Sequence, residues 1–219
     1  MRSGLACDDL DPYSPGNESR MYQTTDWVQF YLNLPQEVAP GTTAQYCTGN
    51  PVALGRVIVS ASHTSIPDFA NKNLFGPLGI TQYRWASYDN GQQTDTGGHL
   101  YLRPRDMLKI GQLALQRGQW NGTQVVATAW VDQSTSKHTE FDYSDGSSDD
   151  YAYLWWRTTE PDGDQSVDMY YANGNGGQRI IVIPTLDMVI VFTAQDYNSS
   201  ASDLEFGLVR SYILPAVVK

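Results

Sequence analysis

Apolar and polar positions follow two different periods along this chain, and the change comes near residue 140. Before that point, apolar residues recur every three or four positions, which is typical of helices that bury one face. The stretch "TTDWVQFYLNLP" (24–35) predicts such a helix, capped by Thr24 or Thr25 and ended by Pro35. Its apolar positions at helical spacing are Trp27, Phe30, Tyr31 and Leu34.

The segment "RPRDMLKIGQLALQRG" (103–118) predicts the clearest helix. Pro104 suits the first turn, and Gly118 suits the end. One face carries Met107, Ile110, Leu113 and Ala114. Shorter helices are expected within 66–80 and, after a turn, within 121–135, whereas "NPVALGRVIVSAS" (50–62) fits either a buried helix or a strand.

After residue 140 the apolar runs become β-branched and aromatic, and turn residues separate them. "FDYSDGSSDD" (141–150) reads as an acidic loop. Four consecutive antiparallel strands are expected in "YAYLWWRTT" (151–159), "VDMYYANG" (167–174), "QRIIVIPTL" (178–186) and "MVIVFTAQD" (188–196). The segment 202–214 then predicts a covering amphipathic helix, with a stripe through Leu204 and Leu208 to Ser211 or Tyr212.

This order predicts an α+β fold with no internal repeat. We expect one structural domain with two parts: a mainly helical part at 1–140, and antiparallel strands with a carboxy-terminal helix at 141–219. The length of 219 residues and the 41% hydrophobic content suit a globular domain with a sizeable core.

The formal net charge of −10 disfavours nucleic acid and anionic membranes as partners, because both attract basic surfaces. No apolar run approaches the roughly 20 residues of a membrane span, and the first 20 residues contain no run of the signal-peptide type. The three histidines and two cysteines lack metal-ligand spacing, and the acidic loops do not fit a calcium-binding pattern. We therefore expect neither a metal site nor a cofactor.

Several segments, in order, carry a resemblance to one family. They are "RSGL" (2–5), "YCTGNPVALG" (46–55), "LFGPLGI" (74–80), "GGHLYLRPRDMLKIGQL" (97–113), "YAYLWW" (151–156) and "ANGNGGQRIIVIPTLDMVIVFT" (172–193). Together they resemble the serine β-lactamase-like hydrolases, which include class C β-lactamases, D,D-peptidases and carboxylesterases. The resemblance implies a β-lactamase/transpeptidase-like fold, with an antiparallel sheet flanked by helices. It also implies hydrolysis of small ester, amide, lactam or peptide-like substrates through an acyl-enzyme, in a periplasmic or secreted protein.

The resemblance assigns roles to individual residues. Tyr46 takes the position of the catalytic tyrosine, which shares proton handling with a lysine. Thr48 stands where the class C branch has asparagine, so it either binds a substrate amide or ester or caps the following helix. Asn173 and Gly174 belong to the substrate-binding strand, and the backbone N–H of Asn175 corresponds to an oxyanion donor. Ala172 replaces the cationic first residue of the K-T-G motif, which weakens the case for penicillin as the substrate.

The nucleophilic S-x-x-K of the family precedes its "SGL" segment, and this chain begins at that segment. We therefore expect a fold that is incomplete on its amino-terminal side, and either a homo-oligomer or a complementing amino-terminal segment. The literal match "STSK" (134–137) follows Tyr46 instead of preceding it, and we interpret it as a chance pattern. The alternative function is a catalytically silent binding module with the same fold.

Cys7 and Cys47 both lie beside segments that carry the resemblance. A disulfide between them would fix the tyrosine turn to the amino-terminal loop and would imply an oxidising compartment. Two buried free thiols are the other possibility, because the sequence does not supply the geometry that a disulfide requires.

Overall fold

The computed structural model of the protein describes residues 1–142, 148–162, 165–197 and 204–217. The chain forms two compact units, Met1–Tyr101 and Leu102–Lys219, and each is described by itself. The change of sequence period at residue 140 falls inside the second unit, where β7 (Thr139–Asp142) begins. No helix among the described residues is both long and apolar enough to cross a bilayer.

The helices of the first unit follow one another along the chain and are short, apart from α3. They are α1 (Glu18–Met21), α2 (Trp27–Leu32), α3 (Gly49–Ser62), α4 (Ile66–Ala70) and the π-helical turn η1 (Asn71–Phe75). The stretch 50–62, which fitted a helix or a strand, lies within α3. The expected cap of α2 at Thr24 or Thr25 is wrong, because the carboxylate of Asp26 accepts the hydrogen bond from the Gln29 N–H at 2.9 Å.

Two short antiparallel pairs accompany these helices. β1 (Tyr83–Trp85) pairs with β4 (Leu100–Leu102), and β2 (Ser87–Tyr88) pairs with β3 (Gln93–Thr94). The core of the unit joins Met21, Trp27, Val28 and Val52 from α1, α2 and α3. The Trp27 ring stacks on Tyr88 with 3.9 Å between centroids, so this core also holds the β2–β3 hairpin against α2.

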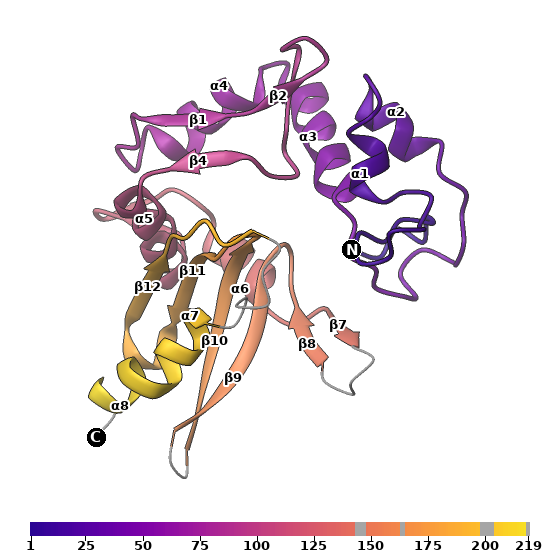
Figure 1. Cartoon of the computed structure of the whole chain (residues 1–219). Helices are drawn as coiled ribbons and strands as arrows, with labels where there is room; N and C mark the ends of the chain where they lie inside the picture. The colour runs from indigo at the N-terminus through magenta and orange to yellow at the C-terminus, as the bar shows by residue number, and fades with distance from the viewer. Residues whose placement is uncertain (143–147, 163–164, 198–203, 218–219) are drawn as a thin grey trace. The chain divides into compact units, whose positions relative to one another are not determined.

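The second unit is built around a six-stranded antiparallel sheet in the order β12-β11-β10-β9-β8-β7 (Figure 1). Its other strands are β8 (Ser148–Tyr151), β9 (Trp156–Asp162), β10 (Gln165–Gly174), β11 (Gln178–Ile183) and β12 (Met188–Phe192). Before the sheet come α5 (Pro104–Leu115), β5 (Gln119–Trp120), β6 (Thr123–Gln124) and α6 (Thr128–Thr135), and a 3₁₀ turn η2 (Pro184–Leu186) joins β11 to β12. Because sequential strands are neighbours throughout, the predicted meander is present.

The start of the meander differs from the sequence expectation. Residues 141–150 were expected to form a loop, but the described residues in that range lie in the β7–β8 hairpin, where Glu140 is opposite Asp150. The expected strand at 151–159 is interrupted, since Leu154 has a φ of 65° and only Trp156 onward continues as β9. A polar hairpin followed by an aromatic turn gives no clean alternation, so the pattern placed both boundaries wrongly.

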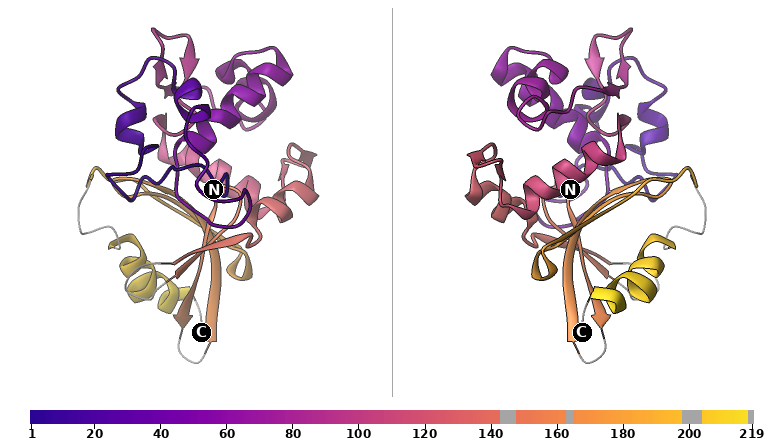
Figure 2. Two further views of the ribbon diagram at one scale, coloured as in Figure 1. Left: turned by 90° about the vertical axis from the view of Figure 1, so that its right-hand side faces the viewer. Right: turned by 90° about the vertical axis from the view of Figure 1, so that its left-hand side faces the viewer.

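Helices cover both faces of this sheet (Figure 2). Met107 and Ile110 of α5 pack against the face that carries Tyr170, Ile180 and Val182, as the predicted apolar stripe required. Gly111 permits the close approach, because an added Cβ would lie 2.4 Å from Val189 Cγ1. On the opposite face, Tyr171 packs edge-on against Phe206 of the carboxy-terminal helix.

The carboxy-terminal helix does not bury the stripe that its sequence suggested. It consists of α7 (Leu204–Leu208), a π-helical turn η3 (Val209–Ile213) and α8 (Leu214–Val217). Leu204, Leu208 and Tyr212 are 62%, 38% and 71% exposed, and the buried residues are Glu205, Phe206, Val209 and Leu214. The expected stripe is therefore wrong. Glu205 shares the inner face of the helix with Phe206 and Val209, and its Oε2 lies 4.0 Å from Arg179 Nη2, whereas Leu204 and Leu208 are exposed.

Candidate functional site

The tyrosine turn lies directly before α3 in the first unit. The Asp9 N–H donates to the Tyr46 carbonyl at 2.8 Å. A disulfide joins Cys7 to Cys47, with 5.5 Å between their Cα atoms, and so fixes the turn to the amino-terminal loop. Both half-cystines are 1% exposed and pack against Tyr31 of α2. The backbone on either side of Tyr46 is thus held by covalent and hydrogen bonds from residues about 40 positions earlier.

Thr48 occupies the N-cap position of α3, but its side chain makes no capping hydrogen bond. Its hydroxyl lies 2.7 Å from Asp9 Oδ2 and 3.1 Å from Glu18 Oε2, and its N–H donates to the same Asp9 oxygen at 2.6 Å. One hydroxyl has a single proton to donate, so the two carboxylates compete for it. Thr48 is buried among protein groups, and its role in substrate binding stays a prediction.

Burial and the two carboxylates both affect the acidity of groups in the turn. The pKa of Tyr46 is raised above its ordinary value, chiefly because the phenol is buried and also because Asp9 and Glu18 disfavour a second negative charge. Burial likewise raises the pKa of Asp9, although hydrogen bonds from Thr48 and from the Glu18 N–H oppose the effect. In this setting Tyr46 is a weaker acid than a free phenol.

The glycine-rich turn between β10 and β11 lies in the second unit. Asn173 and Gly174 end β10, opposite Arg179 and Gln178 of β11. Asn175 follows in the turn itself, and its carbonyl accepts a hydrogen bond from Gln178 Nε2 at 2.8 Å. Both asparagine side chains are exposed, as substrate contacts would require.

Two glycines complete this turn in left-handed conformations, Gly176 with φ 89° and Gly177 with φ 86°. Ala172, at the position of the missing cation, packs against the core between β10 and α5. Asn173, Gly174 and Asn175 therefore lie together at the end of β10, as consecutive residues must. The two left-handed glycines that follow them define the backbone path of the turn.

Sequence reasoning missed the residues that support this turn. Arg179 donates from Nη1 to the Gly174 carbonyl at 3.0 Å, and its Nη2 lies 4.0 Å from Glu205 Oε2. Arg179 and Glu205 are 5% and 7% exposed. A Cβ on Gly177 would lie 2.2 Å from Glu205 Oε1, so the turn closes over a buried charged pair. The available signal was a glutamate among the apolar residues of a predicted covering helix.

A second missed cluster belongs to "DTGGH" (95–99) in the first unit. Asp95 is 1% exposed and accepts hydrogen bonds from the Gly97 and Gly98 N–H groups at 2.9 and 3.2 Å. Its other oxygen lies 2.7 Å from His99 Nδ1. All of these bonds are local, and they shape the loop that precedes β4.

The serine and lysine of "STSK" are each engaged with other groups. Ser134 lies in α6, and its hydroxyl donates to the Val131 carbonyl at 3.1 Å. Lys137 Nζ lies 2.6 Å from Asp150 Oδ1 and 3.0 Å from Glu140 Oε2. These partners raise the pKa of Lys137, which is the opposite of what a general base needs. Both observations support the interpretation of this motif as a chance pattern.

Residues 1–210 match the Beta-lactamase protein family. Among solved structures, a Bacillus anthracis protein provisionally assigned as a 6-aminohexanoate-dimer hydrolase superposes with a TM-score of 0.70 at 20% identity, covering 95% of this chain and 52% of its own. A penicillin-binding protein from Bacillus halodurans superposes with a TM-score of 0.68 at 19% identity, and the match covers 94% of this chain and 70% of that protein. Simvastatin synthase (LovD) from Aspergillus terreus superposes with a TM-score of 0.70 at 14% identity, and the match covers 98% of this chain and 66% of that protein. A search of curated proteins found no match.

Identities this low establish the fold alone, and that fold is the β-lactamase/transpeptidase type with its antiparallel sheet and flanking helices. The chain spans about half the length of the Bacillus anthracis protein. The family match extends over nearly all of the 219 residues, including the tyrosine turn, α5 and the whole sheet. This chain therefore belongs to the Beta-lactamase family.

Proposed function

We propose that the chain is part of a serine hydrolase that cleaves an ester, amide or lactam bond through an acyl-enzyme. The observation that carries the proposal is the tyrosine turn before α3, held by the Cys7–Cys47 disulfide, in a chain that matches the family over residues 1–210. In such a reaction a serine oxygen bonds to the substrate carbonyl carbon, and the leaving group departs with a proton. Water then releases the acyl group from the serine.

Tyr46 is proposed to move the proton between the serine, the leaving group and water. Because burial and the neighbouring carboxylates raise its pKa, this role requires a nearby ammonium group to stabilise the phenolate. We assign that ammonium to the lysine of an S-x-x-K segment. Neither Ser134 nor Lys137 meets the requirement, so the segment is proposed to come from sequence outside these 219 residues, in the same polypeptide or in a partner.

The glycine-rich turn is proposed to stabilise the oxyanion. The backbone N–H of Asn175 would donate to it, and Arg179 would keep the turn in shape through the Gly174 carbonyl. Ala172 offers no cation to a substrate carboxylate. The proposal therefore favours esters or uncharged amides over penicillins as substrates, with Thr48, Asn173 and Gly174 as substrate-binding positions.

The first test uses the purified 219-residue chain with p-nitrophenyl acetate and nitrocefin. We expect turnover close to the uncatalysed rate with both, because the serine and the lysine of "STSK" are each engaged with other groups. Robust turnover that disappears in Ser134→Ala would contradict both the proposal and the interpretation of "STSK".

The second test uses a longer chain that restores an S-x-x-K segment, or that segment added as a separate polypeptide. Labelling by a fluorophosphonate and turnover of p-nitrophenyl acetate are expected to appear together. Tyr46→Phe should then lower the rate about 10²- to 10⁴-fold, the usual contribution of a general acid–base group. Tyr13→Phe is the matched control, because that phenol is 85% exposed.

A restored chain that folds but takes no label would instead indicate a silent binding module. The raised pKa of Tyr46 and the alanine at position 172 are the observations that favour this alternative. Full activity in Tyr46→Phe would remove the tyrosine from the mechanism without removing the hydrolase assignment.

A further inference from the structure

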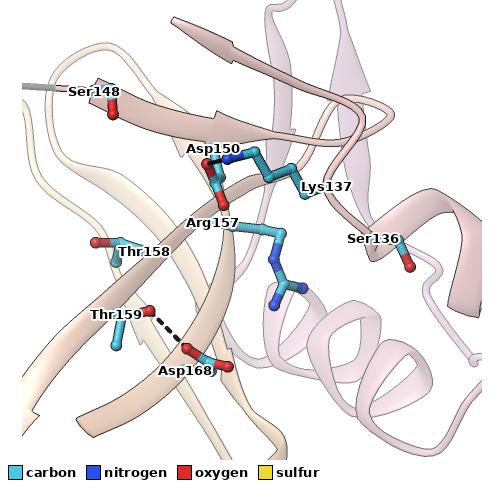
Figure 3. A pocket seen from close by; sticks show the side chains of 8 residues that line it. All are labelled: Ser136, Lys137, Ser148, Asp150, Arg157, Thr158, Thr159 and Asp168. Atoms are coloured by element: carbon cyan, nitrogen blue, oxygen red, sulfur yellow. Dashed lines mark hydrogen bonds and ion pairs between the residues drawn. The ribbon is translucent and has the colours of Figure 1, made fainter. Parts of the chain in front are cut away.

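A polar cavity of about 550 Å³ lies in the second unit, and no residue of the glycine-rich turn lines it (Figure 3). It is formed by β8, β9, β10 and the segment that follows α6. The residues that matter for its chemistry are Lys137, Asp150, Arg157, Thr159 and Asp168. A volume of this order is typical of sites for small molecules.

The strand register places one cation and one anion of this cavity on the same face of the sheet. Arg157 of β9 lies opposite Tyr170 of β10, and Thr159 lies opposite Asp168. Residues two apart on a strand share a face, so Arg157 and Asp168 are diagonal neighbours, with Cα atoms roughly 7–8 Å apart. Such a pair could form a cross-strand salt bridge.

Arg157 and Asp168 do not form that bridge, because each is held by another group. Arg157 Nη1 donates to the Thr135 carbonyl at 2.7 Å, and Asp168 Oδ1 accepts a hydrogen bond from the Thr159 hydroxyl at 2.6 Å. Figure 3 draws the Asp168 carboxylate joined to Thr159 and no interaction between Asp168 and the Arg157 guanidinium. Within the described parts of the chain, no carboxylate oxygen lies within 4.0 Å of the Arg157 guanidinium, and no cation lies within that distance of Asp168.

Asp150, the other acidic neighbour of Arg157, is also paired with a different residue. Asp150 of β8 lies directly opposite Arg157 in the register, yet its carboxylate is bound by Lys137 Nζ at 2.6 Å. Lys137 thus satisfies the anion that would otherwise pair with Arg157. The guanidinium has five N–H donors, and one of them is used by Thr135. The remaining donors can bind a planar acceptor such as a carboxylate through two parallel hydrogen bonds.

We propose that this cavity binds a small zwitterion of the amino-acid class, with its carboxylate on Arg157 and its ammonium group on Asp168. A ligand with both charges can form an ion pair with Arg157 and another with Asp168 at the same time. A simple anion would face Asp168, a simple cation would face Arg157, and a neutral ligand would desolvate two charges without pairing either. The cavity is lined by none of the residues of the glycine-rich turn, and the inference does not depend on the proposed hydrolase activity.

The test is a titration of the ¹⁵N-labelled 219-residue chain with alanine, followed by the amide NMR signals of Thr158 and Thr159. Saturable shifts in the millimolar range are expected, as suits a small ligand in an open polar site. N-acetylalanine lacks the ammonium group and alaninamide lacks the carboxylate, so each should bind at least about tenfold more weakly than alanine. Equal binding of either derivative, or no shifts with alanine at tens of millimolar, would overturn the proposal.

Variants locate the site. Arg157→Gln and Asp168→Asn should each weaken alanine binding at least about tenfold, and Arg157→Gln should do so without improving the binding of alaninamide. Asp187→Asn is the matched control, because Asp187 is exposed, lies outside the cavity and has a left-handed φ of 48° that asparagine adopts readily. Unchanged affinity in both cavity variants would contradict the assignment. The ligand comparison needs no variant, so it decides the matter even if Arg157→Gln fails to fold.

Discussion

At the scale of single residues, Gly177 shows how backbone shape and buried charge depend on each other. Its φ of 86° is strained for any residue with a Cβ, and that Cβ would meet Glu205 Oε1 at 2.2 Å and Ala194 Cβ at 2.9 Å. Neither obstacle is the end of a long flexible side chain on the surface, since Glu205 is 7% exposed. A side chain at position 177 would therefore displace either the turn or the charged pair beneath it.

Gly177→Ala should lower the free energy of unfolding by about 2–4 kcal/mol, the sum of left-handed strain and overpacking. Gly122→Ala is the matched control, because its φ is 80° but nothing lies within 4 Å of an added Cβ. It should lose only the strain, about 1 kcal/mol. Urea unfolding of the three proteins measures both losses. Equal losses would show that the contact with Glu205 does not matter.

Asp9 should make stability depend on pH. Its pKa is raised in the folded protein by burial, with an added effect of the Glu18 carboxylate, so the folded state binds this proton more tightly than the unfolded state. The resulting stabilisation is present below the unfolded pKa of about 3.9 and is lost as the pH rises through the folded value. Between pH 4 and pH 7, wild type should therefore lose stability relative to Asp9→Asn.

Urea unfolding at several pH values provides that comparison. The unfolding free energy of wild type minus that of Asp9→Asn should rise as the pH falls from 7 to 4, because wild type gains the proton that the amide variant cannot bind. Curves that stay parallel from pH 4 to pH 7 would remove Asp9 as a source of pH dependence.

At the scale of elements, two substitutions in the carboxy-terminal helix test which of its faces is buried. Phe206 is 6% exposed and packs on Tyr171, whereas Leu208 is 38% exposed on the outer side. Phe206→Ala should cost about 3–5 kcal/mol of unfolding free energy, and Leu208→Ala about 0.5 kcal/mol or less. The original stripe through Leu204 and Leu208 predicts the reverse order, so a single pair of urea titrations distinguishes the two orientations.

Local pattern was sufficient where one face of an element meets one apolar surface. The spacing of Met107, Ile110 and Leu113 identified the buried side of α5, and β-branched runs identified β10, β11 and β12. It failed where a buried charge governs orientation, as at Glu205, because a hydrophobicity pattern assigns a glutamate to the outside. The π-helical turn at Val209–Ile213 interrupts the regular α-helical spacing, so a period of 3.6 residues does not predict which side chains lie on the buried face beyond it.

The candidate site shows the same division. Resemblance to a family placed Tyr46 and Asn175 in their turns, because those assignments need only neighbours in sequence. The groups that set their chemistry come from elsewhere: Asp9 lies 39 residues before Thr48, and Glu205 reaches the glycine-rich turn from the last helix. Contacts of that separation follow from the tertiary structure and leave no local signal.

At the scale of the whole molecule, the second unit presents two features that another chain could contact: a sheet edge and an exposed apolar stripe. β12, "MVIVF" (188–192), ends the sheet in the described part of the chain, without a charge or proline to discourage pairing. The outer stripe of Leu204, Leu208 and Tyr212 is exposed on the carboxy-terminal helix. Features of this kind favour association with another chain.

The chain alone should therefore self-associate as its concentration rises, measured by size-exclusion chromatography with light scattering. Its net charge of −10 opposes contact between copies, so added salt should strengthen association by screening that repulsion. Replacing Leu208 and Tyr212 together by serine should weaken it. A monomer at all concentrations and salt levels would show that neither feature is an interface.

The Cys7–Cys47 disulfide also closes part of the polypeptide into a covalent ring with a sequence separation of 40 residues. Asp9, Glu18 and Tyr46 all belong to that ring, while α3 leaves it directly after Cys47. A single protease cut between residues 8 and 46 would break the main chain but release nothing, because both pieces stay joined through sulfur. The nicked protein would run as one species on a gel without reductant and as two with it, and the piece that carries Asp9 would remain attached to the piece that carries Thr48.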